Sequence, residues 1–333
     1  MKYIELPRKV LVGDGALAKI PDVLKDLKLS GKSVLAADIV TERIAGERIA
    51  GMLASEVFIV SGSGMPDVDR LAGESVGCGF IVACGGGAVN DVAKLASFRN
   101  GIPYINVPTS ASHDGIASPQ ASLKGEKPVS VRAQCPLGVV ADTALIKKSP
   151  ARLTSSGCAD AISNYTAVLD WKLAHNEKGE YYGDYAAALS EMSARIVMDN
   201  AGKIKSNVSI LVEALISSGV AIGIAGSSRP CSGSEHAFSH ALDLICENPA
   251  LHGEQCGVGA IMMAYLQKSD WQAVKKSLEW CGAPTNAEQM GISRRDVIRA
   301  LSTAHKVRDR YTILRDGISR SKAEEIAEKT GVI

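Results

Sequence analysis

Three of the six histidines lie between positions 236 and 252, where their spacing is that of a candidate metal site. His236 and His240 are four residues apart and therefore share one face if this segment is helical. His252 follows in Leu251-His252-Gly253, where another helix is expected to begin. A buried core histidine explains one of them more easily than all three. A divalent cation at such a site usually takes a carboxylate as a further ligand.

Asp160 is the candidate carboxylate. It lies in Gly157-Cys158-Ala159-Asp160-Ala161, and the pattern places it in the first turn of an otherwise apolar helix over 157–175. An aspartate in that position also suits an N-terminal helix cap, because its side chain can accept the unpaired backbone N–H groups there. By residue type and position alone, both roles stay open.

Two further runs indicate a nucleotide site. Gly85-Gly86-Gly87 follows an apolar strand and opens a helix, so its backbone can approach a phosphate at the positive end of that helix. The run is not the usual G-x-G-x-x-G fingerprint, and a tight strand-to-helix turn is the alternative. The second run, Thr109 to Gly115, ends the next strand with hydroxyl groups and an acid, and alone it would also suit a polar surface loop.

The elements that would position these residues change in character near residue 148. Before it, short apolar strands alternate with amphipathic helices, which is typical of a parallel, doubly wound sheet. The expected strands are 9–12, 33–37, 57–60, 80–83, 104–107 and 137–141, the expected helices are 16–27, 41–53, 67–76 and 88–98, and 117–123 and 129–133 should form a hairpin around a turn at 124–128. After it, helical patterns follow at 157–175, 183–203, 207–225, 232–246, 254–267, 270–281, 294–308 and 319–330. We therefore predict an α/β dinucleotide-binding domain, 1–148, and an all-α metal- and substrate-binding domain, 149–333.

Composition excludes several classes of protein. The 333 residues carry a formal net charge of +1, which argues against a nucleic-acid partner and against a polybasic membrane anchor. The N-terminus lacks the apolar stretch of a signal peptide, and no apolar run is long enough to span a bilayer. The eight cysteines form no C-x-x-C pair, so we expect reduced thiols and a cytoplasmic protein.

Taken together, these motifs resemble a known family, the archaeal sn-glycerol-1-phosphate dehydrogenases. This family belongs to the superfamily of iron-containing alcohol dehydrogenases, glycerol dehydrogenases and dehydroquinate synthases. The resemblance covers nearly the whole chain, and its markers are Gly85–Gly87, Val107–Gly115, Gly157–Ala161, Arg229–His240, Leu251–Gly253 and Arg308–Thr312. One departure is the alanine at position 88, where many relatives carry serine.

The resemblance implies a dehydroquinate synthase-like fold and a Zn2+ enzyme, with one ion per subunit. The enzyme would reversibly reduce dihydroxyacetone phosphate to sn-glycerol 1-phosphate with NAD(H) or NADP(H), for the glycerol backbone of archaeal membrane lipids, as a homo-oligomer such as a dimer or octamer. Carried over by position, the metal ligands are Asp160, His236 and His252, and Asp114, Asp160 and His240 contact the substrate; Asp160, His236, His240 and His252 form the catalytic set. The implied cofactor residues are Gly86, Gly87, Ala88, Val89, Asn90, Asp91, Thr109, Ser110, Ala111, Ser112 and Ser118.

The sequence defines the selectivity for the nicotinamide cofactor and for the substrate less well. Asp38, at the end of the second strand, is a candidate ribose contact that would favour NAD. Arg229, Arg308 and Arg310 are candidate ligands of a substrate phosphate, since arginine suits phosphate through its planar fork of donors. Salt bridges between helices are the alternative for each arginine. A glycerol dehydrogenase, a dehydroquinate synthase-like lyase and a non-catalytic binding module remain as alternative functions.

Overall fold

A computed structural model describes residues 4–62, 64–123 and 129–333. The backbone contacts divide it into two compact units, Met1–Pro150 and Ala151–Ile333. Each unit has elements of its own and is described separately. No helix in the described part of the chain has the length and apolar character needed to cross a membrane.

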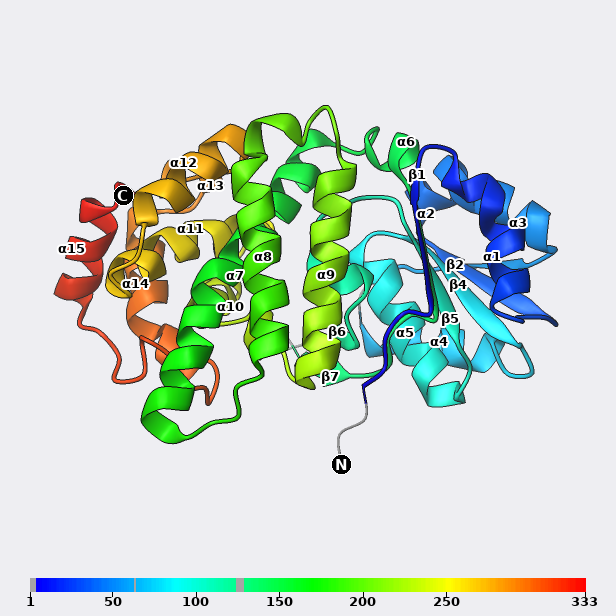
Figure 1. Cartoon of the computed structure of the whole chain (residues 1–333), viewed down its shortest axis with the longest axis horizontal. Helices are drawn as coiled ribbons and strands as arrows, with labels where there is room; N and C mark the ends of the chain where they lie inside the picture. Colours follow the sequence, from blue (N-terminus) through cyan, green and yellow to red (C-terminus); the bar gives the residue numbers. More distant parts are fainter. Residues whose placement is uncertain (1–3, 63, 124–128) are drawn as a thin grey trace. The chain divides into compact units, whose positions relative to one another are not determined.

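The first unit is built on a six-stranded parallel sheet (Figure 1). Its strands are β1 (Lys9–Gly13), β2 (Ser33–Ala37), β3 (Glu56–Ile59), β4 (Phe80–Gly85), β5 (Tyr104–Pro108) and β8 (Gly138–Asp142). Their order in the sheet is β1-β8-β5-β4-β2-β3. Every residue of β2, β4, β5 and β8 is buried, as expected for strands of a parallel sheet that is covered on both faces.

Two hydrophobic clusters pack against opposite faces of this sheet. One contains α1 (Ile20–Asp26) and α3 (Glu47–Leu53), and the other contains α4 (Met65–Glu74) and α5 (Gly87–Asn100). The helix expected over 41–53 is instead three pieces: α2 (Ile39–Thr41), a π-helical turn (Glu42–Gly46) and α3. The predicted doubly wound α/β fold is confirmed.

A two-stranded antiparallel sheet joins β6 (Gln120–Leu123) to β7 (Val129–Arg132). These strands are the two arms of the predicted hairpin, whereas its turn at 124–128 lies outside the described residues. The short helix α6 (Thr143–Ile146), which the pattern did not predict, closes the unit.

The second unit is entirely helical in the described residues (Figure 1). Its helices are α7 (Ala151–Lys178), α8 (Asp184–Asp199), α9 (Ser209–Ala225), α10 (Ser234–Ile245), α11 (His252–Leu266), α12 (Trp271–Cys281), α13 (Ala287–Met290), α14 (Arg294–Thr303) and α15 (Arg320–Lys329), with 3-10 turns at Ala201–Lys203, Arg229–Cys231 and Ala304–Lys306. The 28-residue α7 packs against α8, α9, α10, α11 and α12 and forms the centre of the unit.

Helix α11 approaches α7 closely because glycine faces it at two positions. A β-carbon on Gly253 would lie 2.0 Å from the Ser156 carbonyl oxygen, and one on Gly257 would lie 2.8 Å from Cβ of Ala159. Both spacings are too short for a real side chain. The two helices that carry His252 and Asp160 are therefore almost in backbone contact.

Candidate functional site

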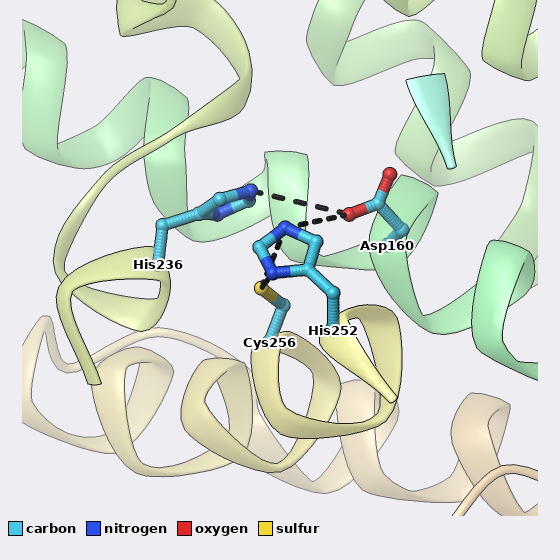
Figure 2. A group of neighbouring side chains, drawn as sticks. All are labelled: Asp160, His236, His252 and Cys256. Carbon is cyan, nitrogen blue, oxygen red and sulfur yellow. Dashed lines mark hydrogen bonds and ion pairs between the residues drawn. The ribbon is translucent and has the colours of Figure 1, made fainter. Parts of the chain in front are cut away.

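Three helices of the second unit bring the predicted metal ligands together (Figure 2). Asp160 comes from α7, His236 from α10 and His252 from the first position of α11. Oδ1 of Asp160 lies 3.9 Å from Nε2 of His236 and 3.8 Å from Nε2 of His252. Both imidazoles thus present the same nitrogen to one carboxylate oxygen.

Asp160 is not a helix cap. Helix α7 begins at Ala151, nine residues earlier, so the expectation of a first-turn position was wrong. Asp160 instead lies inside the helix, and only 4 % of it is exposed. An aspartate is unfavourable inside a helix and expensive to bury, which favours the ligand interpretation over the capping one.

Hydrogen bonds to the far side of each imidazole fix its tautomer. Nδ1 of His236 lies 2.9 Å from Oε1 of Glu235, a carboxylate that is fully buried. Nδ1 of His252 lies 3.1 Å from Oγ of Ser239, and this hydroxyl donates its own proton to Oε1 of Gln255 at 2.6 Å. Each Nδ1 therefore carries the proton, and each Nε2 keeps the lone pair that a metal needs.

Burial lowers the pKa of His236 well below its usual value, and the charges of His240, Arg308 and Arg310 lower it further. His236 is therefore neutral near pH 7. Two imidazoles and one carboxylate form a donor set that fits Zn2+ or Fe2+, and three protein ligands leave a position open for substrate. On this chemistry, the residues present fit the metal that the resemblance implies.

Cys256 lies in the same cluster and was missed. Its Sγ is 3.6 Å from Nε2 of His252, and one potential ligand atom from each of Asp160, His236, His252 and Cys256 lies within 4.8 Å of the others (Figure 2). The signal was present, because Cys256 follows His252 by four residues and so shares its helix face. Burial, followed by the charges of Asp160 and Glu235, raises the pKa of this thiol well above its usual value, so it is neutral in the absence of a cation.

His240 stands beside this cluster rather than in it. Its ring centroid is 5.8 Å from that of His252, and its Nδ1 is 3.7 Å from Oδ2 of Asp243. Asp243 in turn accepts a hydrogen bond from Nε2 of Gln255, and Oε1 of Gln255 accepts one from the Ser239 hydroxyl. One chain of polar contacts thus connects His240 with His252.

We expect Ser239→Ala to weaken metal binding about 10- to 100-fold, because His252 loses the partner that fixes its tautomer. Titration of the metal-free protein with Zn2+ measures this change. Ser190→Ala is the matched control, since Ser190 is equally buried in the same unit and bonds to the Pro230 carbonyl instead. Equal affinities of the two variants would contradict the role given to Ser239.

The glycine run of the first unit forms the turn between β4 and α5. Gly86 is the residue before α5, and Gly87, Ala88 and Val89 form its first turn. The Val89 side chain is buried, so this position can offer only its backbone to a ligand. A β-carbon on Gly87 would lie 2.2 Å from Nε2 of His113, whereas one on Gly86 would find only Ser110 Oγ, at 3.7 Å.

The hydroxyl run lies next to this turn. Gly85 pairs with Pro108 across the sheet, and the Thr109 N–H donates to the Gly85 carbonyl at 3.2 Å. Thr109, Ser110 and Ala111 are buried, and Ser112 is partly exposed. The ends of β4 and β5 thus bring the two predicted nucleotide runs together at the carboxyl edge of the sheet.

Asn90 and Asp91 use their side chains to hold the chain that follows. Asn90 Nδ2 donates to the Gly115 carbonyl at 2.6 Å, and Asp91 Oδ2 accepts from the Ser122 N–H at 3.1 Å. The fully buried Lys94 pairs with Asp91 at 3.1 Å and donates to the Gly115 and Gln120 carbonyls. Lys94, which the sequence did not single out, thereby fixes the segment that carries Asp114.

Three remaining candidates have clear positions. Asp114 begins a 3-10 turn (Asp114–Ile116), and its burial raises the pKa of its carboxyl group. Ser118 is buried, and its hydroxyl accepts the Gln120 N–H at 3.0 Å. Asp38 caps α2 by accepting the Val40 and Thr41 N–H groups at 2.9 and 2.8 Å, so its carboxylate already has backbone partners.

Known proteins match both the sequence and the fold. Residues 11–150 match the family model of iron-containing alcohol dehydrogenase. The chain is 50 % identical to a glycerol-1-phosphate dehydrogenase (NAD(P)+) from Methanosarcina acetivorans, and the match covers 100 % of this chain and 97 % of that protein. A protein of the same name from Thermococcus kodakarensis is 48 % identical, over 99 % and 98 %.

This chain belongs to the glycerol-1-phosphate dehydrogenase family. It is therefore an oxidoreductase, and the resemblance seen in its motifs is confirmed. A solved structure of a probable glycerol dehydrogenase from Sinorhizobium meliloti matches it with a TM-score of 0.78 at 21 % identity, over 99 % of this chain and 98 % of that one. A sulfoacetaldehyde reductase from Bifidobacterium kashiwanohense, solved with NAD+, matches with a TM-score of 0.75 at 17 % identity, over 99 % and 98 %. At these identities the two structures support the fold of this chain and no more.

Proposed function

We propose that this chain reversibly reduces dihydroxyacetone phosphate to sn-glycerol 1-phosphate with NADH or NADPH, using one Zn2+ per subunit. The observation that carries the proposal is the cluster of Asp160, His236 and His252 in a chain with full-length identity of about 50 % to the family. The product would provide the glycerol backbone of membrane lipids. The homo-oligomeric state and the cytoplasmic location stay predictions of the sequence.

Each unit has its own task in this proposal. The first-turn N–H groups of α5 bind the dinucleotide pyrophosphate, and Gly86 lets the phosphate approach them. Thr109, Ser110, Ser112 and Ser118 offer the hydroxyl groups that surround the cofactor, while Asn90 and Asp91 keep the neighbouring segment in place. Asp114 and His240 are the proposed substrate contacts.

In the second unit, Nε2 of His236, Nε2 of His252 and Oδ1 of Asp160 would hold the cation. When bound, the cation acts as a Lewis acid on the substrate carbonyl, and the reduced nicotinamide supplies the hydride. Ser239 and Glu235 hold the protons on the two Nδ1 atoms and keep both rings oriented. Nδ1 of His240 lies 3.7 Å from Oδ2 of Asp243, and His240 is the proposed donor of a proton to the substrate oxygen.

We expect the purified enzyme to oxidise NADH or NADPH with dihydroxyacetone phosphate and to yield only the sn-1 phosphate. Stereospecific analysis of the product tests this directly. Removal of the cation with a chelator should abolish the reaction, and added Zn2+ should restore it. Equal catalytic efficiency on dihydroxyacetone would instead assign the chain to glycerol dehydrogenase chemistry, and formation of the sn-3 phosphate would contradict the stereochemistry.

A further inference from the structure

A guanidinium group in the second unit has no carboxylate partner among the described residues. Arg308 lies in the segment between the 3-10 turn Ala304–Lys306 and α15, and its side chain is partly buried. Within the described part of the chain, its side chain has one hydrogen-bond acceptor, Ser232 Oγ, at 3.5 Å from Nη1. Most of its N–H donors are therefore left for another partner.

The two neighbouring arginines are occupied differently. Arg229 is buried, pairs with Glu180 through Nε and Nη2, and donates through Nη1 to the Tyr311 carbonyl at 2.8 Å. This is the salt-bridge role that the sequence left open, and it leaves Arg229 poorly suited to bind phosphate. Arg310 donates to the Ser232 carbonyl and, at 3.0 Å, to Ser228 Oγ.

These contacts fix the segment next to the metal cluster. Ser232 precedes His236 by four residues, so the acceptor of Arg308 belongs to the turn that leads into α10. The Ile313 N–H donates to Oδ1 of the buried Asp170, whose Oδ2 accepts the Ser234 N–H at 2.7 Å. The segment that carries Arg308 is thereby tied through Asp170 to α7 and to the first residue of α10.

Burial lowers the pKa of Arg308, as expected for a cation that is partly withdrawn from water. Burial and the charges of Arg308 and Arg229 lower the pKa of Arg310 to about 10. Partial burial of a cation without an anion is unfavourable, and an anionic ligand would offset that cost.

We propose that Arg308 binds the phosphate group of the substrate, a small phosphate monoester whose carbonyl faces the metal cluster. Its planar fork of donors matches phosphate oxygens, and Arg229 and Arg310 keep its segment in place. This inference rests on the proposed function, because it needs a phosphorylated substrate at the metal cluster. It deepens that function by naming the residue that separates the phosphorylated from the unphosphorylated ketone.

The test compares dihydroxyacetone phosphate with dihydroxyacetone on four proteins: wild type, Arg308→Ala, Arg308→Lys and Arg315→Ala. Arg315 is the matched control, since it lies on the same segment but pairs with Glu177 at 3.2 Å. We expect Arg308→Ala to lose on the order of 100-fold in kcat/KM for the phosphorylated substrate and to keep its efficiency on dihydroxyacetone. Arg308→Lys should lose less, because it keeps the charge without the fork, and Arg315→Ala should retain the wild-type preference.

Two further readouts separate phosphate binding from a structural role. Inorganic phosphate should compete with dihydroxyacetone phosphate on wild type and much more weakly on Arg308→Ala, and millimolar guanidinium ion should restore part of the lost activity. A wild type that prefers the phosphorylated substrate, with Arg308 variants that lose both substrates in parallel, would overturn the assignment of Arg308 alone. A wild type without that preference would overturn the proposed function, and the assignment with it. If Arg308→Ala does not fold, the same comparison on Arg308→Lys decides.

Discussion

The variant His252→Ala should purify without its metal and lose on the order of 1,000-fold in turnover, equivalent to about 4 kcal/mol of barrier. His252 supplies one of two imidazole nitrogens that face Oδ1 of Asp160. Among the described residues, the cluster contains no further histidine or carboxylate that could replace it as a ligand. Metal content by elemental analysis and single-turnover kinetics measure the two effects. His236→Ala and Asp160→Asn should behave alike.

His240→Ala is the control for this prediction. The imidazole of His240 lies near that of His252 but outside the group of potential ligands, so this variant should keep a full equivalent of metal and lose activity only. Loss of metal from His240→Ala with retention in His252→Ala would mean that the two histidines have exchanged roles. Full metal content in both variants would leave Cys256 as the ligand to examine.

Gly86→Val should raise the dissociation constant for NADH about 10- to 100-fold, the loss of about one charge-assisted hydrogen bond, while the metal site stays filled. The β-carbon itself meets only Ser110 Oγ, at 3.7 Å, so the protein has room for it. The space that it would occupy lies at the first turn of α5, where the pyrophosphate is proposed to approach. Gly86→Ala should show a smaller change in the same direction.

Titration of tryptophan fluorescence with NADH measures the affinity, and Gly73→Val is the control, because a β-carbon at Gly73 meets no atom within 4 Å. Gly87 would be a poor choice, since its β-carbon would collide with His113 and disturb the loop without any ligand. An unchanged dissociation constant in Gly86→Val would exclude this turn as the phosphate site.

The strands of the first unit could be located from sequence because a strand buried on both faces is a continuous apolar run. Ser33–Ala37 has the predicted bounds, and Phe80 and Tyr104 begin their strands as expected. The helix boundaries that were predicted wrongly depend on contacts between residues that are far apart in the sequence. Helix α7 begins at Ala151 although Ser155, Ser156 and Gly157 interrupt the apolar pattern, because Ser155 bonds to the Cys281 carbonyl and Ser156 lies against Gly253.

In the candidate site, some residues could be identified from the sequence and others could not. Residue types and spacing identified Asp160, His236, His240 and His252 as candidates, and the family resemblance selected Asp160, His236 and His252, which the fold then brings together from three helices. The roles of Lys94 and Asp170 could not be predicted, because a buried charge is recognised by its partners. Apart from Asp91, which precedes Lys94 by three residues, the Gly115, Gln120 and Ser234 partners lie 21 or more residues away in sequence. Arg229 and Arg308 also look alike in sequence and differ in their partners, because Arg229 bonds to Glu180 and the Tyr311 carbonyl whereas Arg308 contacts Ser232 Oγ.

The close approach of α11 to α7 has a consequence for protein engineering. Replacing a helix glycine by alanine is a standard route to a more stable protein, with a gain of about 1 kcal/mol at an open site. At Gly253 and Gly257 the new methyl group would instead push apart the helices that carry His252 and Asp160. A stabilisation campaign on this chain should therefore leave both positions unchanged, since they set the distance between the helices that carry two proposed metal ligands.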